Sequence, residues 1–435
     1  MSRCGDTVAA ALPFRAAAAL FIWSAQDADG IVTGNRGGIG FATATGGTAV
    51  GWESVSGARA QCAAQAGASA ALVEVDARER RISAVAEAAF GHRSVSLNWR
   101  TGAHTDARIR YFAIGGADVT AQARWLEVPP GNARQTVTGL GFVPTLLLFV
   151  PAIATVGDEP VAGLLAGFGA ATAREQAAAG YLLRDAAGPG AVVGAQLSGC
   201  SVVGFGDGFS IARRARVAAL TSDGFDLEWS ASPGGGELRV ACLALGGVDA
   251  QLGLGHSPPA PGHSRTRTTL VRPRAIAFFS WGLGARDAPA DIARLSVGFA
   301  CPPAISACVA WDERDVPAQL TSSHTASSTS DVIVVTNTQT GGLHAAATPA
   351  SVGEWGFALD WHHSDGFRRQ FVYIAVGCAR FRSRSLGRLV QALAGGAAST
   401  ATRARWLRRA VGRVGAPARA AADRRDRSAL RRRGP

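Results

Sequence analysis

The chain contains 435 residues with a formal net charge of +12 at pH 7, and all 44 of its basic residues are arginine. From Arg380 onward, 16 arginines and 2 aspartates give a local charge of +14, which leaves −2 for the preceding residues. This distribution excludes a chain built of several basic domains, because the positive charge is confined to a C-terminal tail. No uninterrupted apolar run approaches about 18 residues, so we expect no transmembrane segment.

The N-terminal residues 8–23 are mostly apolar and follow Arg3, a pattern that imitates a secretory signal peptide. Pro13 and Arg15 interrupt this run, and residues 14–23 match segments that recur later in the chain. A segment that the fold requires is not normally cleaved away. We therefore expect no signal peptide and predict a first core strand here.

Three segments alternate between large apolar residues and small or polar ones, and each ends in a tryptophan. The three tryptophans are separated by 130 and 132 residues, in the segments 95–99, 225–229 and 357–361. After a gap rich in turn residues, each segment is followed by a second apolar one, at 111–115, 242–246 and 373–377. Period-2 alternation predicts strands with one buried face, and the glycine-rich gaps predict hairpins.

Further landmarks recur in the same order in each third of the chain. They are Gly-Phe pairs at 40–41, 167–168 and 298–299, followed by the aromatic residues Trp52, Tyr181 and Trp311. Self-similarity at a fixed period of this kind predicts three homologous units, at residues 1–118, 134–249 and 265–379. Each unit contains several short strands separated by turn signals, which predicts an all-β protein of tandem, jelly-roll-like β-sandwiches. The units either stand in a row or close around a pseudo-threefold axis.

The segments between the predicted units are rich in proline and glycine. Residues 119–133 contain Pro-Pro-Gly and residues 250–264 contain a similar cluster, so we expect stiff spacers there. Within the first unit, the alanine-rich residues 58–71 favour one short helix.

The recurring aromatic residues Trp52, Tyr181 and Trp311 have two interpretations. Large aromatic side chains usually pack in a core, and we favour that role for each of them. The alternative is that each ring stacks on a sugar, which would make the units lectin-like modules that gain avidity by repetition.

The tail at residues 380–435 is basic and partly amphipathic. Two stretches, 385–393 and 400–414, place apolar residues at helical spacing, so the tail is expected to be partly helical or disordered. Basic amphipathic stretches can bind nucleic acid, an anionic membrane surface or an acidic groove on a partner. The alternative is a solvated extension without a partner. The candidate contacts with an anionic partner are Arg403, Arg405, Arg408, Arg409, Arg431, Arg432 and Arg433.

Motifs that carry catalytic or metal chemistry are missing from the sequence. There is no GxSxG, HExxH or CxxC motif, and the glycine-rich residues 34–40 have no Walker lysine and precede an apparent strand. The pair His362-His363 is a poor chelate, because adjacent residues in a strand point to opposite faces. The seven cysteines do not recur in register, so we expect mostly free, buried thiols. We predict no catalytic residues, no cofactor and no metal, and hence no enzyme; a hydrolase with a single active unit is a weaker alternative.

Two motifs carry a resemblance, GIGFAT at 38–43 and LGFVPTLLLF at 140–149. Each is followed later by a predicted strand, YFAIGG at 111–116 for the first and ACLALGG at 241–247 for the second. The chain resembles poorly characterised phage and prophage structural proteins with repeated β-sandwich units. This resemblance implies a non-enzymatic, virion-associated protein with a structural or receptor-contacting role. It also implies production in the host cytoplasm and partners among particle proteins, including further copies of the chain, or a host surface glycan.

Overall fold

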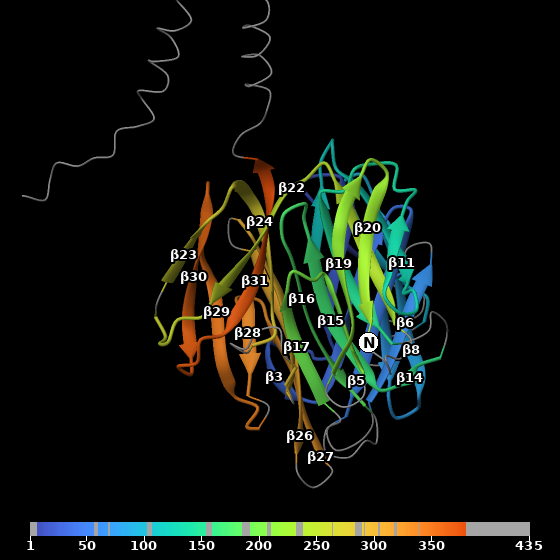
Figure 1. Ribbon diagram of the computed structural model, residues 1–435. Helices are drawn as coiled ribbons and strands as arrows, with labels where there is room; N and C mark the ends of the chain where they lie inside the picture. The colour runs from blue at the N-terminus through green and yellow to red at the C-terminus, as the bar shows by residue number, and fades with distance from the viewer. Residues whose placement is uncertain are drawn as a thin grey trace, which may run out of the picture. The chain divides into compact units, whose positions relative to one another are not determined.

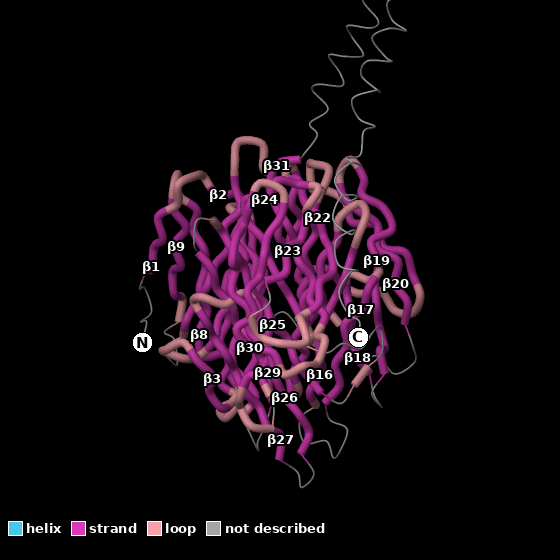
Figure 2. The backbone as a smooth tube through the Cα atoms, turned by 90° about the vertical axis from the view of Figure 1, so that its left-hand side faces the viewer, coloured by secondary structure: helices cyan, strands magenta, loops and turns pink. Residues whose placement is uncertain are grey.

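The computed structural model describes residues 7–379 apart from the gaps 56–59, 68–69, 102–106, 154–158, 185–191, 207–209, 232–237, 263, 283–288, 291, 303–304, 317–319 and 338. Every regular element in these residues is a β-strand, as the alternating sequence pattern predicts (Figure 2). No helix in the described part of the chain is long and apolar enough to cross a membrane. Residues 1–380 form one compact unit.

The first pair of sheets comes from the N-terminal third of the chain. Its inner sheet has the order β10-β2-β4-β5-β6, and its outer sheet has the order β1-β9-β8-β7. The strands are β1 Thr7–Ala11, β2 Ala16–Ser24, β4 Asn35–Thr43, β5 Gly46–Ser54, β6 Ala60–Gly67, β7 Ala70–Asp76, β8 Arg81–Phe90, β9 Ser94–Trp99 and β10 Arg108–Gly115.

The second pair repeats this order with one additional strand. Its inner sheet is β11-β21-β13-β15-β16-β17 and its outer sheet is β12-β20-β19-β18. The strands are β11 Thr120–Glu127, β12 Ala133–Val137, β13 Leu146–Ala152, β15 Leu164–Ala171, β16 Gln176–Leu183, β17 Val192–Ser198, β18 Val202–Gly206, β19 Ser210–Thr221, β20 Gly224–Ala231 and β21 Arg239–Gly246.

The third pair has the same order again. Its inner sheet is β22-β31-β24-β25-β26-β27 and its outer sheet is β23-β30-β29-β28. The strands are β22 Asp249–His256, β23 Ser264–Thr268, β24 Val271–Ser280, β25 Ile292–Cys301, β26 Ile305–Val316, β27 Leu320–Ser328, β28 Ile333–Thr336, β29 Leu343–Gly353, β30 Gly356–Ser364 and β31 Gln370–Ala379.

Each sandwich has its own apolar core, and the three inner sheets also share a central core. The alternating residues Phe225, Leu227 and Trp229 of β20, for example, belong to the core of the second sandwich. The central core takes side chains from all three inner sheets, such as Phe41, Phe168 and Phe299. Because strand residues alternate between faces, an inner sheet that is covered on both sides reads as a nearly continuous apolar run.

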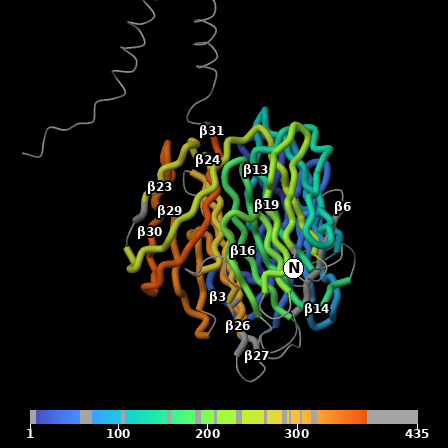
Figure 3. The backbone as a smooth tube through the Cα atoms, viewed as in Figure 1, coloured from blue at the N-terminus to red at the C-terminus, as the bar shows by residue number. Residues whose placement is uncertain are grey.

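The three inner sheets are linked edge to edge in a cyclic order, by two short strands and one isolated bridge. The short β14 (Val161–Ala162), which precedes β15, pairs with β6 of the first inner sheet. Gly194 of β17 forms a bridge with Ala290, which precedes β25. Strand β3 (Gly30–Thr33), which precedes β4, pairs with β27 of the third inner sheet, and Figures 1 and 3 show the blue β3 beside orange strands. The third pair therefore returns to the first, and the links between the three pairs of sheets form a closed cycle.

Two local predictions are wrong. The segments 119–133 and 250–264 are not spacers, because β11 and β22 lie in them and pair over eight residues with β21 and β31. The alanine-rich residues 58–71 contain the strand β6 and the start of β7 instead of a helix. In both cases a partner strand decides the conformation, which local propensity does not report.

Candidate functional site

The recurring aromatic residues meet inside the central core. Trp52 lies on β5, Tyr181 on β16 and Trp311 on β26, and each side chain is at most 1% exposed. The rings of Trp52 and Trp311 make an edge-to-face contact with centroids 5.0 Å apart. Asn35 of β4 connects Trp52 to Tyr181. Trp52 Nε1–H donates to Asn35 Oδ1 (3.0 Å), and Asn35 Nδ2–H donates to Tyr181 Oη (2.5 Å). We call Asn35, Trp52, Tyr181 and Trp311 the axial cluster.

The burial of these rings contradicts the alternative in which each ring stacks on a sugar. A stacking platform needs an open ring face, and none of the three has one. Burial also raises the pKa of Tyr181 well above 10.0, with a further contribution from the nearby carboxylate of Glu313. Tyr181 is therefore a neutral hydrogen-bond partner in the interior.

The three aromatic residues are not in the same strand register, although their order in the sequence suggests it. Trp52 lies opposite Gly37 and Trp311 lies opposite Leu295, each four residues before the recurring phenylalanine of its sheet. Tyr181 lies opposite Ala166, which is two residues before Phe168. A shift of two residues keeps a side chain on the same face of the sheet, so all three still point into the central core.

A close approach explains one glycine of the glycine-rich residues 34–40. A Cβ atom on Gly37 would lie 2.2 Å from the carbonyl oxygen of Trp23 and 2.5 Å from Nε1 of Trp311. Any side chain at this position would collide with the indole ring that completes the axial cluster. These glycines therefore belong to a strand that is packed from both sides and not to a phosphate-binding loop.

Charged residues directly neighbour the axial cluster along the strands of the first and third inner sheets, with their side chains on the opposite sheet faces. The Arg36 guanidinium lies 3.3 Å from the Glu53 carboxylate, and their counterparts Arg294 and Asp312 face each other across β25 and β26. Burial lowers the pKa of Arg294 to about 10, although Asp312 opposes this shift. Burial also raises the pKa of Asp312, against the opposing effect of His324 Nδ1 at 3.1 Å.

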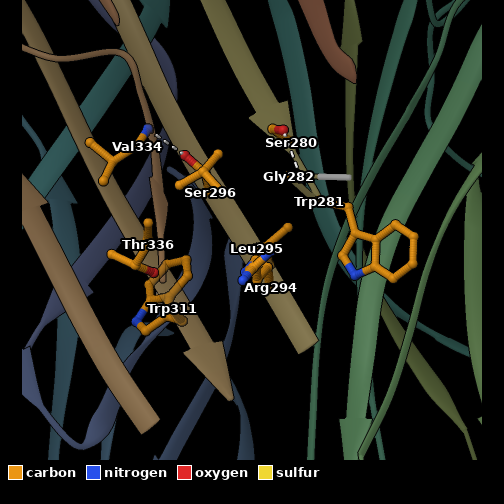
Figure 4. Close-up of a pocket in the computed structure, with 11 residues that line it drawn as sticks. Ser280, Trp281, Gly282, Arg294, Leu295, Ser296, Trp311, Val334 and Thr336 are labelled. Carbon is orange, nitrogen blue, oxygen red and sulfur yellow. Dashed lines mark hydrogen bonds between the residues drawn. The ribbon is translucent and has the colours of Figure 1, made fainter. Parts of the chain in front are cut away.

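A narrow crevice lies beside Arg294 in the third sandwich (Figure 4). The rings of Trp281 and Trp311 line it together with Ser280, Ser296 and other residues of the third sandwich. The two hydroxyl groups are already used, since Ser280 Oγ accepts from the N–H of Gly282 (3.0 Å) and Ser296 Oγ accepts from the N–H of Val334 (3.2 Å). The crevice has no room for a water molecule, so it does not form a ligand pocket in this conformation.

The third sandwich also contains three pairs of histidine and aspartate. The nitrogen–oxygen distances are 3.1, 2.6 and 2.7 Å, in the pairs His324–Asp312, His344–Asp365 and His362–Asp331. A hydrolytic triad requires in addition a nucleophile on the other ring nitrogen. Within the described residues, the hydrogen bonds of these rings reach carboxylates and no hydroxyl group, and no three histidine, cysteine or acidic side chains converge to hold a metal.

Two further predictions from the sequence concern the cysteines and the tail. Among the described cysteines, Cys242, Cys301 and Cys308 are free thiols, and Cys242 and Cys308 are buried, as expected for cysteines without a disulfide framework. The arginines of the tail (Arg403, Arg405, Arg408, Arg409, Arg431, Arg432 and Arg433) lie outside the described residues, as do the helices expected there.

Comparison with protein-family models and with curated protein sequences gives no match. The function proposed below is therefore inferred from the geometry of the chain itself. Sequence analysis missed Asn35, Arg294, Asp312 and His324. A polar residue next to an otherwise apolar strand was the available signal, but a single sequence does not show which partner such a residue meets.

Proposed function

We propose that the chain is a non-enzymatic structural component of a phage or phage-derived particle, with a structural or receptor-contacting role. The observation that carries this proposal is the filled central core shared by three inner sheets. An enzyme or a small-molecule receptor normally keeps a cleft or cavity in which its ligand is enclosed. Here the place where three sheets meet is occupied by the axial cluster and by phenylalanine side chains.

The cyclic arrangement supports the same proposal. Three similar sandwiches in one chain present three similar outer faces around a pseudo-threefold axis. Symmetric particles present repeated contacts, and a chain with internal symmetry matches such a set without needing three separate copies. The resemblance of the repeated motifs to phage structural proteins points in the same direction.

The carbohydrate-binding alternative has no specific support. It depended on exposed rings at Trp52, Tyr181 and Trp311, and these rings are buried. The hydrolase alternative depended on a cleft that gathers histidines and carboxylates. The histidine and aspartate residues of the three pairs do not line the crevice beside Arg294, which is lined by described residues.

The test is mass spectrometry and negative-stain microscopy on particles purified from the source organism after induction. We expect the chain at a fixed copy number relative to the other particle proteins, and uninduced cultures that are fractionated in the same way serve as the control. If the chain is abundant in the cells but missing from purified particles, the proposal is wrong.

A further inference from the structure

The first inner sheet ends at β10, whose counterparts in the other two inner sheets are each covered by a further strand. Strand β10 pairs with β2 and, within the described residues, with no strand on its other side. The corresponding strands β21 and β31 are each covered by an antiparallel strand of eight residues, β11 and β22. Strand β10 also has eight residues, Arg108–Gly115, so the uncovered edge has the same length as the two covered ones. An exposed row of backbone N–H and C=O groups is a template for strand addition.

The two covered edges show what kind of strand this position takes. Ala121 and Ala123 of β11 lie opposite Leu245 and Leu243, and Ala250 and Leu252 of β22 lie opposite Val376 and Ile374. All four residues contribute to the central core. On β10 the matching positions are Ile114 and Phe112. An incoming strand therefore needs small or aliphatic residues at alternating positions.

An exposed apolar residue lies where a strand added beside β10 would pass. Strand β11 passes the hairpin between β4 and β5, where its Ala123 carbonyl oxygen lies 3.4 Å from a Cβ built on Gly46. Gly46 is the residue that closes this hairpin, and the residue that closes the matching hairpin of β25 and β26 is Ile305. Ile305 is 63% exposed. Phe112 of β10 stacks on Phe299 of β25 with centroids 5.6 Å apart, so β10 and this hairpin are neighbours.

Charged side chains lie at the N-terminal end of β10. Arg108 and Arg110 both lie 2.9 Å from the same oxygen of Asp29, so two guanidinium groups share one carboxylate. On the covered edge, Glu127 at the C-terminal end of β11 lies 3.3 Å from Arg239, the counterpart of Arg108. An ion pair at such an exposed position contributes little affinity but favours one register and one direction.

We propose that the open edge of β10 binds an extended segment of another protein by antiparallel strand addition. The segment has small apolar residues at alternating positions, which cover Ile114, Phe112 and Ile305, and an acidic residue at its C-terminal end, which pairs with Arg108 or Arg110. This goes beyond the proposed structural role, because it names the surface and the chemistry of a partner. It holds whether or not the chain belongs to a particle.

A proline substitution can block the open edge of β10 without removing a hydrogen bond between β10 and β2. The carbonyl oxygen of Leu245 accepts a bond from Thr145 on the β13 side, so the backbone groups of the next residue, Ala244, face β11. The counterpart of Ala244 on β10 is Ala113, which lies opposite Ala19 as Ala244 lies opposite Leu147. The N–H of Ala113 therefore faces the open edge, where a proline is tolerated.

The experiment measures binding of a labelled peptide with the sequence of β11, residues 120–127, to the full chain by fluorescence anisotropy. We expect saturable binding to the wild-type chain and at least about tenfold weaker binding to Ala113→Pro, because a proline removes a ladder donor and blocks close approach. Ile305→Asp, an exposed change that leaves the backbone intact, should also weaken binding. A peptide that ends in lysine instead of glutamate should bind less well than the original. Ala244→Pro is the matched control, since at a covered edge it should lower the melting temperature strongly.

Several results would overturn the proposal. One is equal binding to the wild-type chain, Ala113→Pro and Ile305→Asp, and another is no binding of the peptide to the wild-type chain. Binding that occurs only after removal of residues 381–435 would show that the chain's own C-terminal segment is the occupant. A wild-type dimer that Ala113→Pro dissociates, without peptide binding, would show that the occupant is a second copy.

Discussion

Replacing Phe168 by alanine tests whether the three inner sheets are one cooperative unit. Phe168 is 1% exposed on β15 of the second inner sheet. Its ring contacts Phe41 of the first sheet, with centroids 6.5 Å apart, and Phe279 of the third, with centroids 5.3 Å apart. One side chain therefore joins all three inner sheets.

The expected cost follows from these contacts. Truncation of a fully buried phenylalanine lowers the free energy of unfolding by about 3–5 kcal/mol. Each lost aromatic pair adds about 0.5–1.5 kcal/mol beyond the buried area. Because Phe168 loses two such pairs, we expect a loss at or above the upper end of the range for a buried phenylalanine, about 5 kcal/mol or more.

Urea unfolding, followed by tryptophan fluorescence and by far-ultraviolet circular dichroism, measures this loss. The wild-type chain should unfold in one transition that both probes report, and Phe168→Ala should shift the whole transition. Phe367→Ala is the control of equal size, because Phe367 is 69% exposed and the Arg369 guanidinium carbon lies over its ring, 5.7 Å from the centroid. We expect it to cost less than about 1 kcal/mol.

A double-mutant cycle sharpens the test. Phe168→Ala and Phe279→Ala should be coupled by about 0.5–1.5 kcal/mol, because their rings are in contact. Phe168→Ala and Phe225→Ala should be additive, since Phe225 lies in the separate core of the second sandwich. The reasoning fails if Phe168→Ala costs no more than Phe367→Ala, or if it shifts one of several resolved transitions and leaves the others unchanged.

Two further predictions concern the sandwich core and the axial cluster. Trp229→Ala should destabilise the chain by about 3–5 kcal/mol, because Trp229 is 4% exposed and its Nε1–H donates to Gln135 Oε1 at 2.9 Å; an unchanged melting temperature would show that this indole is not a core residue. Tyr181 should stay protonated above pH 10.0 in the native chain, because burial raises its pKa. The unfolded chain loses this proton at lower pH than the native chain, so stability falls as the pH rises above that value. Ultraviolet titration should show less tyrosinate in the native than in the unfolded chain, and a smaller difference in Tyr181→Phe. Ionisation of all three tyrosines in a chain that keeps its native circular dichroism would contradict this assignment.

The features that sequence analysis predicted best depend on local pattern. Alternation in residues such as Phe225, Leu227 and Trp229 predicts a strand with one buried face, and the structure places them on β20 in a sandwich core. This works because the geometry of a strand fixes which side chains share a face, whatever the partner. The predicted core role of Trp52, Tyr181 and Trp311 depended on the same reasoning, and all three are buried.

The errors have a common cause, which is that strand pairing is not local. The β11 segment contains arginine and glutamine and precedes a Pro-Pro-Gly sequence, so its local pattern resembles a spacer, yet β21 offers it an edge with the right length. The two-residue shift at Tyr181 depends on how β15 and β16 pair, and a shift of that size leaves the pattern of faces unchanged.

By itself, the sequence determined the all-β class, the period of the recurring motifs and the confinement of positive charge to the tail, because these properties belong to composition and short-range order. The tertiary structure decided between a row and a closed cycle, placed Asn35 between Trp52 and Tyr181, and left β10 without a second partner strand among the described residues. These outcomes depend on contacts between residues more than 100 positions apart, such as Asn35 with Tyr181. Each residue of such a pair is compatible with many partners, and only the packing of the whole chain selects one of them.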